Sequence, residues 1–172
     1  MNINKFTQNS LQAVQNCEKI AADNGNQELA QEHLLYALLV QDDSLILKLL
    51  EKMSIQGQLF INRVEQAIGK RPKVQGGQPY VGQGLNNALI HAEDEAKQMS
   101  DEYVSVEHLF LSLLKYASKE MKEIFREFGV SREGFLHALS TVRGNQRVTS
   151  DNPEATYDTL NKYGQDLVER AR

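Results

Sequence analysis

The chain has one cysteine, three prolines, no long apolar run and no strong excess of charge among its 172 residues. A single cysteine excludes an internal disulfide and a zinc cluster built from cysteines. The longest apolar run, Leu34 to Val40, is far shorter than the ~20 residues of a membrane-spanning helix. The first ten residues, MNINKFTQNS, lack the apolar centre of a signal peptide, so we expect a cytoplasmic protein without a membrane partner. A formal net charge of −4 offers no general attraction to nucleic acid, and we expect none as a partner.

Motifs for catalysis and for metal binding are also missing from the sequence. The only Gly-Lys pair, Gly69-Lys70, is followed by Arg71 and lacks the upstream glycine of a phosphate-binding loop. His33 and His108 each follow a glutamate, but neither has a second ligand three or four residues away on its own helix. The simpler interpretation places both glutamates in the first turn of a helix, where the dipole favours acids. We therefore predict no catalytic residue, no metal and no cofactor in these 172 residues.

The apolar pattern predicts an all-α protein. Apolar residues recur every three or four positions, as in Leu11, Val14, Cys17 and Ala21, which form one face of a helix. Cys17 is accordingly predicted to be a small buried side chain and not a nucleophile. Residues 69–84 hold five of the eleven glycines and two of the three prolines, so this stretch predicts a connection. We expect four helices on each side of it.

The two blocks resemble each other. EHLLYALL at 32–39 matches EHLFLSLL at 107–114, an offset of 75 residues. The same offset aligns Ala13 with Ala88 and Phe60 with Phe135 without a gap. We predict two tandem pseudo-repeats, about 1–69 and about 85–143, joined by a linker at 70–84. They should pack as a pseudo-twofold pair with a groove where they meet.

The remaining residues predict a second linker and a further helix. Residues 144–152 are polar, and Asn152, Pro153 and Glu154 form a typical helix start. We expect 153–172 to be the first helix of a domain that the chain does not contain.

The repeated EHLL motif, the DEYVSVEHLFLSLL stretch and the final run from Pro153 to Leu167 resemble one family. Together they are similar to the duplicated N-terminal domain of the Clp protein unfoldases, and the final run resembles the junction into the first ATPase module of ClpB-type disaggregases. The resemblance implies a stress-response chaperone that forms an ATP- and Mg-dependent homohexamer with a coiled-coil insertion, and that works with a DnaK-type partner. This chain would be its mobile, monomeric substrate-engaging domain, carried on a flexible tether, and would not hydrolyse ATP alone.

The resemblance also implies a set of residues that contact unfolded or aggregated proteins. A surface threonine and an acidic pair correspond to Thr7, Asp101 and Glu107. An apolar groove corresponds to five further residues: Leu89, Ile90, His91, His108 and Leu109. Two of these are histidines where some relatives carry leucine, so we expect a more polar groove and weaker binding.

The residues alone leave other interpretations open. Thr7 and Ser105 sit where helix N-caps are expected, and Asp101 lies in a predicted turn. The main alternative is an adaptor-docking domain of a protease-partnered Clp unfoldase. A stand-alone scaffold and a small hydrolase using His33 or His108 are two others.

Overall fold

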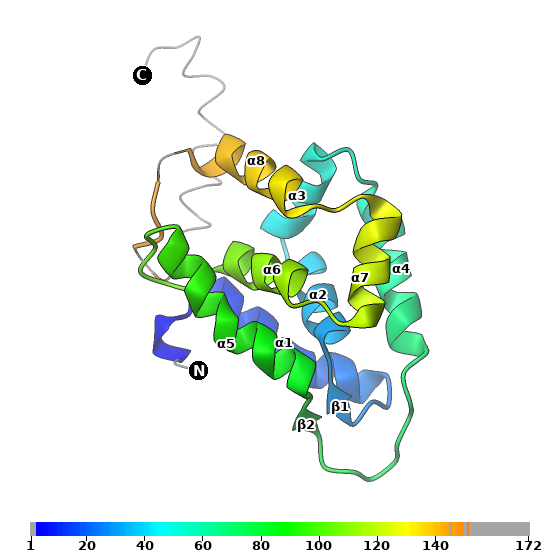
Figure 1. Ribbon diagram of the computed structural model, residues 1–172. Helices are drawn as coiled ribbons and strands as arrows, with labels where there is room; N and C mark the ends of the chain where they lie inside the picture. Colours follow the sequence, from blue (N-terminus) through cyan, green and yellow to red (C-terminus); the bar gives the residue numbers. More distant parts are fainter. Residues whose placement is uncertain (1–2, 145, 150, 152–172) are drawn as a thin grey trace.

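The computed structural model describes residues 3–144, 146–149 and 151 of the chain. These residues form helices in two groups of four, which confirms the all-α class (Figure 1). A short 3-10 helix, Ile3–Lys5, precedes the first group. The groups are α1 (Gln8–Asp23), α2 (Gln31–Leu39), α3 (Leu45–Lys52) and α4 (Gly57–Gly69), then α5 (Gln83–Gln98), α6 (Val106–Lys115), α7 (Lys119–Phe128) and α8 (Arg132–Arg143). The predicted helix at 153–172 lies outside the described residues.

Hydroxyl side chains and one glycine explain several of these helix ends. Ser44, Ser118 and Ser131 accept hydrogen bonds from the first turns of α3, α7 and α8, which satisfies backbone donors that have no partner within the helix. Gly129 ends α7 in the left-handed conformation, with φ of 68°, which glycine adopts without strain.

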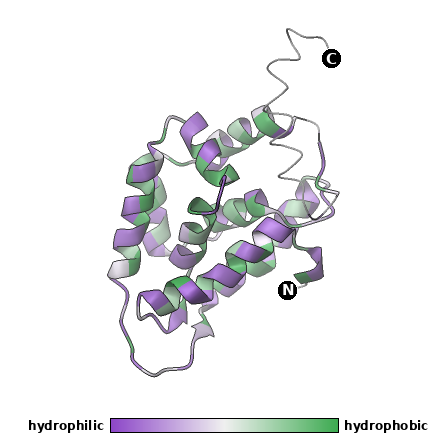
Figure 2. Cartoon of the chain, turned by 180° about the vertical axis from the view of Figure 1, so that it is seen from behind, coloured by the Kyte–Doolittle hydropathy of each residue, from purple (hydrophilic) through white to green (hydrophobic). Residues whose placement is uncertain are grey.

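Helices α2 and α6 lie in the middle of the molecule, with the other helices around them (Figure 1). Eight of the nine residues of α2 are buried, so this helix is apolar nearly all round, as a surrounded helix must be. The outer helices are amphipathic, with apolar residues on one side and polar residues on the other (Figure 2). The core of the domain is therefore built on the two EHLL segments.

Contacts between the two groups follow the 75-residue offset. Helix α3 packs on α8, and α4 packs on α7. Adding 75 to the residue numbers of α3 gives residues of α7, and subtracting 75 from those of α8 gives residues of α4, so the two contacts are equivalent. Phe60 of α4 stacks on Phe125 of α7 at 6.4 Å and meets Phe128 edge-on at 5.1 Å. These aromatic pairs join the two groups.

Two short backbone pairings follow the same offset. Strand β1 (Glu28–Leu29) pairs in parallel with β2 (Tyr80–Val81), so Leu29 lies opposite Val81. A parallel bridge also joins Phe6 to Val104, and these positions are 81 − 75 and 29 + 75. Each group thus donates a short extended segment to the other, which is the arrangement expected of a pseudo-twofold pair. The sequence does not predict these strands, because two residues are too few to produce an alternating pattern.

Candidate functional site: a buried acid–arginine cluster and an exposed apolar stretch

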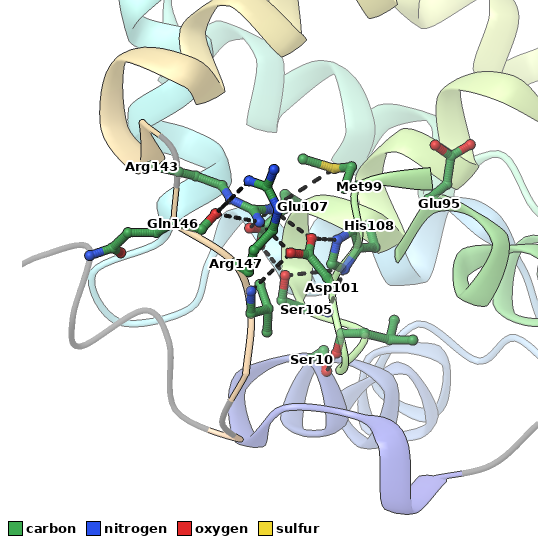
Figure 3. Close-up of polar contacts among 12 residues, drawn as sticks. Ser10, Glu95, Met99, Asp101, Ser105, Glu107, His108, Arg143, Gln146 and Arg147 are labelled. Atoms are coloured by element: carbon green, nitrogen blue, oxygen red, sulfur yellow. Dashed lines mark hydrogen bonds and ion pairs between the residues drawn. The ribbon is translucent and has the colours of Figure 1, made fainter. Parts of the chain in front are cut away.

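Asp101, Glu107 and His108 meet at the start of α6, together with Arg143 from the end of α8 (Figure 3). We call these four residues the Arg143 cluster. Their side chains are between 0 and 3% exposed. The positive end of the α6 helix dipole stabilises negative charge at this position, which partly explains why the cluster contains two acids.

The hydrogen bonds of His108 fix its protonation state. The backbone N–H of Ser105 donates to Nδ1 of His108 at 2.9 Å, so this nitrogen carries no proton. Nε2 must then hold the proton of the neutral ring and donates it to Oδ2 of Asp101 at 2.6 Å. His108 is therefore a structural donor to the carboxylate and not a base with an open lone pair.

Arg143 supplies the positive charge of the cluster. Its guanidinium donates to both carboxylate oxygens of Asp101, and Nη1 lies 3.3 Å from Oε2 of Glu107. The same side chain donates to the backbone carbonyl of Gln146, from Nη2 at 2.9 Å. One arginine thus bridges the two acids and the residues that follow α8.

These contacts control the ionisation of Asp101. Burial by itself would raise the pKa of this carboxyl. Hydrogen bonds from His108, from Arg143 and from the backbone of Val148, together with the Arg143 charge, outweigh burial and hold the pKa well below its usual range. Asp101 is consequently a buried carboxylate that stays charged at any ordinary pH.

Thr7 lies beside this cluster as the N-cap of α1. Its Oγ1 accepts from the backbone N–H of Ser10 at 3.2 Å, so the predicted cap is confirmed. Its own N–H donates to the carbonyl of Val104 at 2.9 Å. Thr7 is fully buried, and the expectation of a surface threonine is wrong because the start of α1 is covered by the loop before α6 and by residues after α8.

The residues after α8 lie against this region. Val148 is fully buried, its N–H donates to Oδ1 of Asp101 at 2.9 Å, and its carbonyl accepts from Glu102 at 2.8 Å. The carbonyl of Asp151 accepts from the N–H of Gln8 at 2.7 Å. We call residues 146–149 and 151 the docked segment. The sequence predicts a flexible tether here, whereas the described part of it is hydrogen-bonded to the domain.

The predicted apolar groove is only partly at the surface. Leu89, His108 and Leu109 are buried in the core and line no open groove. Ile90 is 44% exposed, and the half-exposed ring of His91 stacks on Tyr116 with centroids 4.2 Å apart. The structure thus leaves two of these five positions able to touch a partner directly. Tyr80 and Val81, 53% and 49% exposed, precede them in β2.

The first repeat contains a counterpart of the cluster with different chemistry. His33 accepts from the N–H of Ala30 at 2.9 Å and donates to Oδ1 of Asn26 at 2.9 Å, so Asn26 stands where the second repeat has Asp101. Glu32 pairs with Arg71 at 3.0 Å. Burial, and to a lesser degree the Arg71 charge, lowers the pKa of His33 to about 4.

The sequence analysis does not identify Arg143 or Val148 as part of the site. Arg71 and Arg143 each form an ion pair with the glutamate of an EHLL motif. They are 72 residues apart instead of 75, so the repeat alignment does not match one with the other. Val148 stands alone in a polar stretch, and no periodicity marks it as buried. One feature of the sequence could have suggested the arginines: each EHLL motif contains an acid, and a buried acid needs a cation as its partner.

Within the described ranges there is no group of three potential metal ligands and no helix able to cross a membrane. Burial raises the pKa of the Cys17 thiol to about 12, so it is a core side chain and not an activated nucleophile.

Comparison with known proteins identifies relatives along the whole chain. The family model of the Clp repeat (R) N-terminal domain matches residues 5–128. The chaperone protein ClpB of Nitratidesulfovibrio vulgaris is 49% identical over all of this chain, and that of Bacillus anthracis is 37% identical over 98% of it. The chain spans about a fifth of the length of these relatives, 21% and 20%.

Solved structures agree with this fold. The Hsp104 N-terminal domain of Candida albicans matches with a TM-score of 0.72 and 25% identity, over 86% of this chain and 97% of that one. A ClpV N-domain in complex with a VipB peptide matches with a TM-score of 0.65 and 20% identity, over 86% and 92% of the two chains. The second likeness shows the fold alone.

Proposed function

Because the chain belongs to the Clp repeat N-terminal domain family, we propose that it is the substrate-engaging domain of an ATP-dependent protein disaggregase. It binds unfolded or aggregated polypeptides and passes them to a hexameric ATPase ring formed by the rest of the protein. The full-length protein, and not this domain, binds ATP and magnesium and works with a DnaK-type chaperone. The ClpV N-domain that holds a VipB peptide supports a peptide-binding role for this fold.

The observation that carries this proposal is an exposed apolar stretch, which we define as Tyr80, Val81 and Ile90. Among the described residues, seven large hydrophobic side chains are at least 44% exposed. Three of the seven lie between residues 80 and 90, in β2 and α5. Apolar contact without a shaped pocket accepts many sequences, which a general client-binding domain needs.

Such a surface binds weakly, and we expect a Kd of tens of micromolar, or about −6 kcal/mol. Six copies on one ring would raise the overall affinity for an aggregate if their tethers allow several to engage together. Weak single contacts also permit release into the ring, which a tight binder would prevent.

Fluorescence anisotropy of a labelled, permanently unfolded polypeptide titrated with this chain tests the proposal. Ile90→Ser should weaken binding several-fold, because it removes an exposed apolar contact without disturbing the core. Leu59→Ser is the matched control, since Leu59 is 52% exposed but lies on α4, outside the apolar stretch. The native, folded protein from which that unfolded polypeptide is derived should not bind.

Equal loss in the two variants, or no binding at several hundred micromolar, would contradict the proposal. The second result would favour the alternative function, in which the domain docks a folded adaptor protein for a protease-partnered unfoldase.

A further inference from the structure

We infer that a basic groove between the end of α6, helix α7 and the start of α8 binds acidic segments of unfolded client polypeptides. The groove is lined by apolar and basic side chains: Leu114, Lys115, Lys122, Phe125, Arg126 and Arg132. We call these six residues the basic groove. The inference rests on the proposed function and adds to it a second contact, which selects clients by charge.

The basic groove combines an apolar floor with a cationic rim. Phe125 is buried and Leu114 is half-buried, whereas the three basic side chains Lys115, Lys122 and Arg126 are exposed. None of the described residues that line the groove is acidic, although the whole chain carries a formal net charge of −4. Its volume of about 480 Å³ is that of a site for a small ligand, so it accommodates a short piece of polypeptide and not a folded domain.

Three cations of the groove have no acidic partner in the domain. Arg132 is neutralised, because its guanidinium donates to both carboxylate oxygens of the buried Glu95, at 2.5 and 3.1 Å. Lys115, Lys122 and Arg126 form no ion pair within the described ranges of the chain. Their charges therefore remain available to the acidic groups of a ligand.

The charges of α7 are sorted onto two edges of the helix. Lys122 and Arg126 are four residues apart, so they lie on one edge, which lines the groove. Glu123 and Glu127, each one position further along, lie on the next edge. That edge faces α4, where Arg63 holds Glu127 at 2.9 Å and also feels the charge of Glu123. These two acids are thus directed at α4 and not at the groove.

The first repeat closes the place that is equivalent to the groove. At the offset of 75 residues, the counterparts of three basic residues are apolar, acidic and glycine: Leu47, Glu51 and Gly57 for Lys122, Arg126 and Arg132. A Cβ at Gly57 would lie 2.6 Å from Cδ1 of Leu47, so Leu47 already occupies this space. The packing of a repeat therefore does not require the three cations, and the basic groove is particular to the second repeat.

The basic groove lies within reach of the apolar stretch. Tyr116 stacks on His91, the neighbour of Ile90, and Nζ of Lys115 lies 5.6 Å from the centre of the Tyr116 ring. Gln98 borders the groove from α5 and follows Ile90 by about 12 Å along the helix. About four residues of an extended polypeptide cover that distance, so one client segment can contact both places.

A client segment fits this groove when acidic and apolar residues alternate along it. Successive side chains of an extended chain point to opposite sides, so the acids can meet the rim while the apolar residues enter the floor. Each exposed ion pair contributes up to about fivefold to the affinity, so two or three pairs should together give about tenfold. Because the cations are exposed, salt should screen this gain.

Fluorescence anisotropy with the complete 172-residue chain compares two labelled peptides, the acidic GSDFELDGS and its neutral counterpart GSNFQLNGS. The unchanged chain should bind the acidic peptide about tenfold more tightly at about 50 mM salt, and this ratio should fall toward one at about 500 mM. The double variant Lys122→Glu with Arg126→Glu should abolish the ratio. Arg132 is left unchanged, because its loss would leave the buried Glu95 without a cation.

Lys52→Glu with Lys70→Glu is the matched control, since it makes the same change in net charge at exposed positions outside the groove. This control should keep most of the preference for the acidic peptide. An equal loss in the two double variants would mean that the preference follows net charge, and would overturn the inference. Lys122→Gln with Arg126→Gln adds no acid and should lower the ratio to about threefold, which tests the groove without introducing repulsion.

Equal affinities of the unchanged chain for the two peptides would also overturn the inference. Ile90→Ser should weaken both peptides alike and leave their ratio unchanged, so it tests the proposed function separately. The acidic sequence fixed in a helix of a folded carrier protein should bind more weakly than the free peptide, because a helix does not place alternate residues on one side. Equally tight binding of that carrier would overturn the assignment to unfolded clients.

Discussion

Replacing Arg143 by methionine should destabilise the domain strongly, because it leaves two buried carboxylates without their cation. The side chains of Arg143, Asp101 and Glu107 are 3%, 0% and 0% exposed, so little solvent screens the cluster. Removing one partner of a buried ion pair costs about 3–5 kcal/mol. For a domain of this size, that corresponds to a fall in Tm on the order of 10 °C.

Urea unfolding followed by circular dichroism at 222 nm measures this effect. Arg63→Met is the matched control, since Arg63 forms a bidentate pair with Glu127, a surface residue, at 2.9 and 3.0 Å. That pair is screened by water, and its loss should leave the unfolding midpoint nearly unchanged.

The pH dependence provides a second check on the same variant. In the unchanged chain the depressed pKa of Asp101 contributes stability that is present above about pH 4 and lost as the pH falls further. Without Arg143, burial is less opposed and the pKa rises, so protonation relieves the unpaired charge. The stability gap between the two proteins should therefore narrow from pH 7 to pH 4. A loss below about 1 kcal/mol at pH 7, or a constant gap, would refute the reasoning.

Three further outcomes can be measured. Thr7→Ala should cost about 1 kcal/mol in thermal unfolding through loss of the α1 cap, and Thr7→Ser should restore most of it; equal losses would mean that the cap is not the cause. Because the pKa of His33 is lowered to about 4, the unfolded chain takes up the proton first, and stability should fall as the pH drops from 6.5 toward 4. The non-titrating variant His33→Asn should flatten this slope, and an unchanged slope would assign it to another group. Cys17 should react with a thiol reagent only after unfolding, because burial raises its pKa to about 12; fast reaction of the native protein would contradict its burial.

The sequence by itself was sufficient for the helical class, the two blocks of four helices and the family resemblance. These properties are local or repeated: a 3.6-residue apolar period, glycine and proline between blocks, and two EHLL segments at a fixed offset. The role of Thr7 as a helix cap also follows from the sequence, since a cap depends on residues within one turn.

Only the tertiary structure decided which candidate residues are accessible. Leu89 and Ile90 are neighbours in the sequence, yet one is 4% and the other 44% exposed, because consecutive helical residues point in different directions. The meeting of Asp101 with Arg143 and Val148 spans more than 40 residues and depends on how α8 returns to the start of α6. Burial, ion pairing and the place of the docked segment follow from such long-range packing. Local sequence patterns do not predict that packing.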